Sequence, residues 1–183
     1  MTLQADRRLE WAVGKVADDK AAWMYGEYFA EIGPVLAEYD NQQAASFAVV
    51  ATNVKGVQPT AGVFSTWPSA EARVGFHEDP RFTKVQPARD AAMEMFSFGN
   101  SIESMDEVIT LNTDSDYAVI IAKSYPLSAA PIFRLPLSKD SPEQTYAGKS
   151  FSLLPWNAEV EQLMTSSADG VEVYRVRFNP AAQ

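Results

Sequence analysis

The sequence contains no cysteine and a single histidine, His77, among its 183 residues. Without cysteine the chain can form no disulfide, thiolate nucleophile, zinc–thiolate site or iron–sulfur cluster. With one histidine it cannot build a metal site that needs two imidazole ligands, and no carboxylate pattern typical of metal binding stands out. We therefore expect no metal site and no cofactor.

Long apolar runs and an excess of basic residues are absent as well. No segment approaches the roughly 18 consecutive apolar residues of a membrane span, and the polar start at residues 1–8 does not resemble a signal peptide. Acidic residues number 24 against 15 basic ones, which gives a formal net charge of −9. Such a charge repels nucleic-acid phosphates and anionic lipid headgroups. We expect a cytoplasmic protein that binds neither nucleic acid nor membranes.

The first part of the chain carries the periodicities of an α+β domain. Leu9, Trp11 and Val13 alternate with smaller or polar neighbours, which is typical of a half-buried strand. The same reasoning predicts strands at 9–16, 45–54, 61–67 and 105–112, with helices at 21–39 and 68–98, the second interrupted at Asp79-Pro80. This order is the split βαβ pattern of ferredoxin-like folds.

The second part repeats the pattern in shortened form. Strands are predicted at 117–123, 131–137, 149–154 and 171–178, with one helix at 156–165. The stretch "FSTWPSAEA" at 64–72 returns as "FSLLPWNAEV" at 151–160, so that the two phenylalanines lie 151 − 64 = 87 residues apart. The match is either chance, because strand–proline–helix junctions are common, or the trace of a repeated unit. We favour a degenerate tandem repeat with units at 1–113 and 114–183, the second lacking the first helix.

Three segments carry a resemblance to a known family: "YFAEIGPVLAEYD", "GVFSTWPSAEARVGFHEDPRF" and "VQPARDAA". Together they resemble the dimeric α/β-barrel superfamily, in particular its small uncharacterised members related to antibiotic-biosynthesis monooxygenases and stress-responsive barrel proteins. The resemblance covers residues 9–112. It implies ferredoxin-like antiparallel sheets with helices on one face, and a second sheet that covers the open face. That second sheet comes either from another chain, as in a homo-oligomer, which we favour, or from a second unit of the same chain.

The resemblance also frames the expected function. The leading hypothesis is a protein that binds a small apolar or aromatic molecule, as a cofactor-independent monooxygenase-like enzyme. A non-catalytic structural or stress-related barrel protein is one alternative, and a haem-binding protein that uses the single histidine is another. Whether the protein is an enzyme at all stays open at this point.

Candidate site residues follow from these hypotheses. His77 and Asn53 are the candidate catalytic residues, and Trp11, Tyr25 and Trp67 the candidate ligand-binding residues. Each has a plainer reading: a solvent-facing histidine near a helix end, a turn asparagine that bonds locally, and aromatic residues of an ordinary core. Three arginines are expected to be solvated or paired with nearby acids: Arg73 with Glu71, Arg81 with Glu78 and Arg89 with Asp90.

Overall fold

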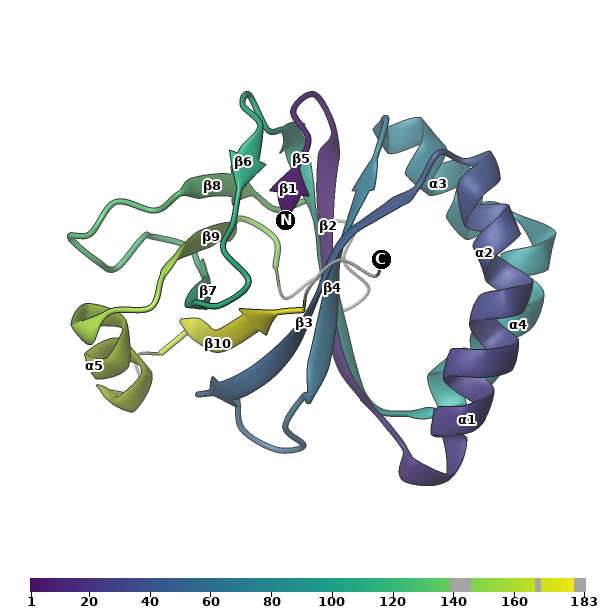
Figure 1. The fold of residues 1–183 in the computed structure, drawn as a ribbon, viewed down its shortest axis with the longest axis horizontal. Coiled ribbons are helices and arrows are strands. Elements are labelled where there is room, and N and C mark those ends of the chain that lie inside the picture. The colour runs from purple at the N-terminus through teal and green to yellow at the C-terminus, as the bar shows by residue number, and fades with distance from the viewer. Residues whose placement is uncertain (139–145, 167–168, 180–183) are drawn as a thin grey trace.

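A computed structural model shows an α+β protein built on a large antiparallel sheet that nearly closes into a barrel (Figure 1). The structure describes residues 1–138, 146–166 and 169–179. Within them the sheet has eight strands, in the spatial order β5-β2-β4-β3-β10-β7-β9-β8. The strands are β2 (Arg8–Val16), β3 (Gln42–Thr52), β4 (Ala61–Trp67), β5 (Met93–Ser104), β7 (Asp116–Ala122), β8 (Phe133–Pro136), β9 (Ser150–Pro155) and β10 (Glu172–Phe178).

The two edge strands of this sheet approach each other. An antiparallel bridge joins Ser101 to Leu137, and the backbone N–H of Ser138 donates to the carbonyl of Asn100 at 2.8 Å. These contacts bring the end of β8 against β5. A small second sheet, β1 (Thr2–Leu3) with β6 (Ile109–Thr110), lies beside the barrel strands (Figure 1).

Each half of the chain contributes four neighbouring strands in the same relative order. If the strands of each half are numbered along the chain, both halves have the spatial order fourth, first, third, second. This order is β5-β2-β4-β3 in the first half and β10-β7-β9-β8 in the second. The halves join where β3 pairs with β10. All these pairings are antiparallel.

Helices cover the outer face of each half unequally. The first half carries α1 (Ala21–Trp23), a π-helical turn (Met24–Tyr28), α2 (Phe29–Glu38), α3 (Ala70–Glu78) and α4 (Pro80–Ala91), which form one layer beside β2–β5 (Figure 1). The second half carries α5 (Ala158–Ser166), and the segment between β7 and β8 contains no helix. No helix in the described ranges is long and apolar enough to cross a bilayer.

Local sequence signals define the helices beside the barrel. The Ser69 side chain accepts a hydrogen bond from the backbone N–H of Ala72 and so caps α3, which begins two residues after Pro68. Asp79 caps α4 in the same way, through the N–H of Arg81. Pro34 lies inside α2, and the irregular turn occurs earlier, at Met24–Tyr28.

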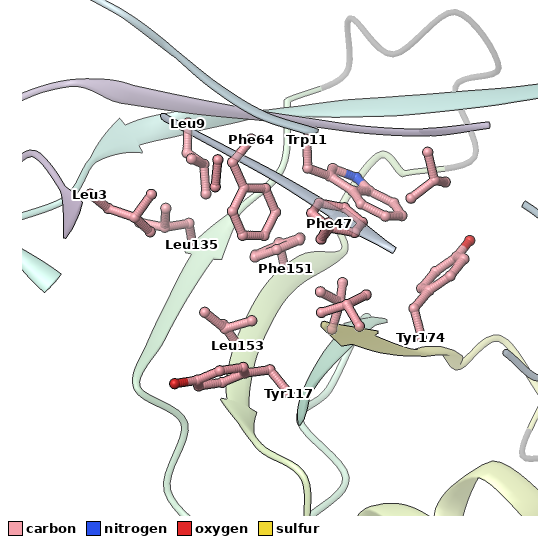
Figure 2. Packing of buried hydrophobic residues seen from close by; sticks show 14 of the residues in the cluster. Leu3, Leu9, Trp11, Phe47, Phe64, Tyr117, Leu135, Phe151, Leu153 and Tyr174 are labelled. Carbon is pink, nitrogen blue, oxygen red and sulfur yellow. The ribbon is translucent and has the colours of Figure 1, made fainter. Parts of the chain in front are cut away.

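The main core fills the barrel interior. Leu9, Trp11 and Val13 on β2 point inward, as their alternation predicts, and each is at most 3% exposed. Phe64 of the first half packs against Phe151 of the second, with ring centroids 5.5 Å apart (Figure 2). The two halves therefore share one core rather than folding around separate ones.

The predicted helix at 68–98 and strand at 105–112 are wrong at their boundary. Helix α4 ends at Ala91, and the fourth strand is β5, which runs from Met93 to Ser104. The inward position opposite Trp11 is Gly99, where an added Cβ would lie 3.1 Å from the Trp11 indole nitrogen. The indole of Trp11 leaves little room for a side chain at Gly99, and the neighbouring inward residues Ser97 and Ser101 are polar, so β5 lacks the apolar alternation by which a strand is recognised.

The shared core yields a prediction about coupling between the halves. Phe64→Leu and Phe151→Leu should each lower the free energy of unfolding by about 1–2 kcal/mol. Because the two rings are in contact, the double variant should differ from the sum of the singles by at least about 0.5 kcal/mol in urea unfolding. As a control, Phe151→Leu combined with Phe82→Leu, whose ring lies in the helix-side cluster, should be additive. Additivity of the Phe64 and Phe151 pair would contradict a common core.

Candidate functional site

A cavity of about 760 Å³ lies between the helix layer and the outer face of the first-half sheet. Its lining comes from β2, β3, β4 and β5 on one side and from the helical segments between Met24 and Arg89 on the other. Figure 1 shows the helix layer and the sheet that bound it. The cavity is thus separate from the barrel interior, which lies on the opposite face of the same strands.

Small side chains on the outer face of the sheet explain why this space exists. Because Leu9, Trp11 and Val13 point inward, the intervening Ala12 and Gly14 face the helices and line the cavity. The adjacent strand β4 adds outward residues of modest size: Ala61, Val63 and Ser65. Side chains this short cannot reach the helix layer, so space remains between the two.

Aromatic rings form a large part of the remaining wall. Trp67 and Phe76 lie 5.4 Å apart between ring centroids, and Phe76 and Phe82 lie 4.5 Å apart. Phe96 and Phe98 project from β5 on the same side. A concave, mainly apolar space of this size with a few polar groups is the usual form of a small-molecule site.

One end of the cavity carries a charged group built on Glu10. The Glu10 carboxylate forms an ion pair with Arg73 of α3, and its Oε2 lies 3.9 Å from Nε2 of His77. Burial of Glu10 favours the neutral acid, but the contacts from His77 and Arg73 outweigh it and hold the pKa of this carboxyl below its ordinary value. Glu10 is therefore a carboxylate at neutral pH.

The His77 ring is fixed in place by aromatic neighbours. It stacks on Phe98 with centroids 6.1 Å apart and planes within 7°, and it meets Phe82 edge to face at 5.2 Å. Its Nε2 is buried and has no hydrogen-bond partner among the described residues. The indole N–H of Trp67, a residue that is 1% exposed, is in the same state. Buried polar atoms without partners are uncommon and call for an explanation.

A second cation, Arg89, lines the cavity from α4. Its Nε donates to Asp90 at 2.7 Å, and its guanidinium lies 4.7 Å from the centroid of the Phe96 ring. No carboxylate in the described part of the chain hydrogen-bonds to its two outer nitrogens. Burial raises the pKa of the nearby Tyr28 phenol, although the charge of Arg89 opposes the shift. Tyr28 is therefore a neutral hydroxyl at physiological pH.

Three of the five residues predicted from the sequence lie at this cavity: His77, Trp67 and Tyr25. Trp11 does not, because it points into the barrel, where its ring meets Tyr174 at 5.0 Å. Asn53 lies elsewhere too. Its side-chain amide donates to the carbonyl of Val171 and accepts from the N–H of Val173, so it ties the chain after β3 to β10.

Sequence reasoning missed Glu10 and the part that Arg73 plays. The predicted Arg73–Glu71 pair is wrong, because Arg73 is buried and pairs with Glu10, 63 residues away in the chain. The predicted Arg89–Asp90 pair is confirmed, whereas Arg81 pairs with Asp79 and Glu38 rather than with Glu78. One signal for Glu10 was present: a charged residue at a strand position between two inward-facing apolar residues.

Comparison with known proteins adds information on the fold. No protein-family model and no curated protein matches the sequence. Among solved structures, an anthrone oxidase-like protein superposes with a TM-score of 0.51 at 12% identity, over 100% of this chain and 98% of that one. A candidate monooxygenase from Fusobacterium nucleatum subsp. nucleatum gives a TM-score of 0.45 at 10% identity, over 96% and 94% of the two chains. The first superposition shows that this chain shares the fold of the anthrone oxidase-like protein along its whole length.

Proposed function

We propose that this protein binds a planar aromatic molecule in the cavity beside β2 and oxidises it with dioxygen, as a cofactor-independent monooxygenase-like enzyme. The observation that carries the proposal is the cavity itself, which combines aromatic walls with an ionised Glu10 next to the unpartnered Nε2 of His77. A site of this kind can hold a flat apolar molecule and remove a proton from it.

The proposed architecture is a dimeric α/β barrel made within one chain, from ferredoxin-like units at 1–113 and 114–183. The identical strand order of the two halves supports it. The strand register supports it as well. Phe64 pairs with Trp11 on β2, the first strand of the first unit, and Phe151 pairs with Ile121 on β7, the first strand of the second unit. The recurring sequence motif thus occupies the same place in both units. Since each sheet covers the other, a homo-oligomer is not needed to bury them.

Only the first unit carries the charged group. Glu10 pairs with Ser65, the residue after Phe64, and the equivalent partner of Ser152 in the second unit is Ile120. Ile120 is buried in the cluster beneath α5. An apolar residue at that position leaves no acid or base there, so the proposed chemistry belongs to one site in each chain.

The proposed reaction assigns a role to each polar side chain. Nε2 of His77 accepts a proton from an acidic C–H or O–H group of the ligand, and the Glu10 carboxylate stabilises the resulting imidazolium. Arg89 stabilises the negative charge that develops on a ligand oxygen. The electron-rich anion then reduces dioxygen. For a methylene carbon next to a carbonyl, the balance is CH₂ + O₂ → C=O + H₂O, so one oxygen atom enters the product and the other leaves as water.

Haem does not fit the residues present. An axial bond requires a histidine nitrogen that faces a space open to the porphyrin. At Nε2 of His77, the Glu10 carboxylate lies 3.9 Å away and pairs with Arg73, so it occupies part of the room that a porphyrin plane needs, whereas a single ligand O–H or C–H needs far less. Phe98 and Phe82 enclose the face and the edge of the ring. The proposed reaction therefore uses no haem.

Ligand binding is the first prediction. Anthrone and 2-naphthol should raise the melting temperature of the protein, because a ligand that binds only the folded state stabilises it. The substitution Ala12→Phe places a ring in the cavity and should weaken binding of both compounds by at least about tenfold. Ala88→Phe on α4 is the matched control, because Ala88 is exposed and lies outside the cavity lining. Haem should cause no shift of its Soret band. Failure of every compound to bind would favour the non-catalytic barrel protein.

Catalysis is the second prediction. With a ligand that binds, His77→Gln should lower kcat for oxygen uptake by about 10²–10⁴-fold, the usual contribution of a general base. Asn53→Ala should leave kcat unchanged, since Asn53 lies outside the cavity, and should lower the free energy of unfolding by about 1–2 kcal/mol through its lost backbone hydrogen bonds. Equal loss of activity in both variants would contradict the assignment of His77.

Acid sensitivity is the third prediction. The pKa of Glu10 is lower in the folded chain than its ordinary value of 4.5. Its charged form therefore stabilises the fold above pH 4.5, and this stabilisation is lost as the pH falls through the folded pKa. In urea unfolding between pH 7 and pH 3, the wild type should lose more stability than Glu10→Gln below about pH 4.5. Parallel curves for the two proteins would show that Glu10 is not held as a buried carboxylate.

A further inference from the structure

Two aromatic side chains line the cavity and are exposed to solvent at the same time. Tyr25 is 63% exposed and Phe29 is 45% exposed, and no other aromatic residue in the described ranges belongs to the exposed large hydrophobic residues. Both line the cavity. A side chain that borders a cavity and also meets solvent stands at its mouth. We call Tyr25 and Phe29 the rim pair.

The rim pair is ordered by its neighbours rather than scattered on the surface. The two residues are four positions apart on one helical face, and their rings lie nearly parallel, with centroids 6.4 Å apart and planes within 18°. Phe29 also meets Tyr28 edge to face at 5.2 Å, and Tyr28 is only 7% exposed. Because Tyr28 lines the cavity, this contact links the rim pair to the cavity wall.

The backbone beneath the rim pair is unusual for a helix. The turn Met24–Tyr28 is π-helical, a form that occurs mostly as single turns and often at functional sites. Gly26 and Gly33 lie in the same helical stretch, and an added Cβ at either would meet no atom within 4 Å. Neither has a positive φ. Packing and backbone geometry therefore do not require these glycines, although each weakens a helix relative to alanine. Gly33 lines the cavity, so a side chain at this position would take up cavity space.

The rim pair and the charged group lie at different ends of the helix layer. Tyr25 belongs to the π-helical turn that follows α1, whereas His77 belongs to α3, and Figure 1 places α1 and α3 at opposite ends of that layer. His77 and both rim residues line the same cavity. A ligand of several fused rings that reaches His77 therefore extends further toward the mouth than a ligand of one ring.

We propose that Tyr25 and Phe29 determine specificity, by packing their ring faces on the outer part of a flat ligand with two or three fused rings. The inference rests on the proposed function, because it needs a ligand in this cavity, and it names the class: fused-ring aromatic compounds in preference to single-ring ones. Contact between ring faces is favourable beyond the area it buries. It also removes two exposed apolar side chains from water, which the free protein leaves uncovered.

The test compares three probes, phenol, 2-naphthol and anthrone, with dissociation constants from isothermal titration calorimetry. The double variant Tyr25→Ala/Phe29→Ala should bind anthrone at least about tenfold more weakly than the wild type and phenol less than about twofold more weakly. Tyr25→Phe keeps the ring and should keep the preference. Val74→Ala on α3 removes an exposed apolar side chain outside the cavity lining and should change neither constant. Melting temperatures check that each variant folds.

Each outcome decides between the two proposals. If the wild type binds fused-ring compounds and the double variant loses its preference for them, the specificity role holds. If the double variant binds all three probes as the wild type does, or loses affinity equally for all three, the specificity role is overturned while the cavity remains a binding site. If the wild type binds none of the probes, and no probe raises the melting temperature of the wild type above that of Ala12→Phe, the proposed function fails. The specificity role then fails with it.

Discussion

The strict alternation of side chains on β2 is the constraint on which the rest of the structure depends. A strand sends successive side chains to opposite faces, and β2 uses this to place bulk on one face and space on the other. Trp11, inside, packs against both halves of the chain and sets the size of the barrel core. Ala12 and Gly14, on the outer face, are too small to fill the space below the helix layer, and the cavity lies there. A shift of one residue in register would bury Glu10 in the apolar core and expose Trp11.

Charge then connects this strand to the helices. Glu10 stands at the buried wall of an apolar space, where an unpaired carboxylate would be strongly disfavoured. Arg73 and His77, one helical turn apart on α3, supply the compensating contacts. The ion pair between Glu10 and Arg73 joins α3 to β2 and so holds His77 beside the cavity. In the second half Ile120 stands at the corresponding place, so α5 packs directly on the sheet. An apolar contact in the second half thus takes the place of the charged contact between Glu10 and Arg73 in the first.

Much of the architecture followed from local patterns. The strand at 61–67 has its predicted bounds, and the cap at Asp79 with Pro80 at the start of α4 is confirmed. These features depend on residues adjacent in the chain, such as alternation within one strand or a side chain that bonds to a backbone N–H two residues on. The motif at Phe64 and Phe151 also drew attention to two segments that the structure brings into contact. Of the candidate site, the sequence pointed to His77 and the aromatic wall but to no acid.

The sequence by itself determined where apolar and polar residues alternate along a strand and where helices begin. It also determined that one histidine, His77, is present for acid–base chemistry. Only the tertiary structure decided which face of each element is enclosed and what lies across from it. Gly99 suits its position in β5 because Trp11 lies opposite and leaves little room for a side chain. Arg73 pairs with Glu10 rather than with a neighbour, because the helix that carries it folds back over β2. Contacts between residues far apart in the chain depend on how the sheet and the helices pack together. A local sequence pattern carries no information about that packing.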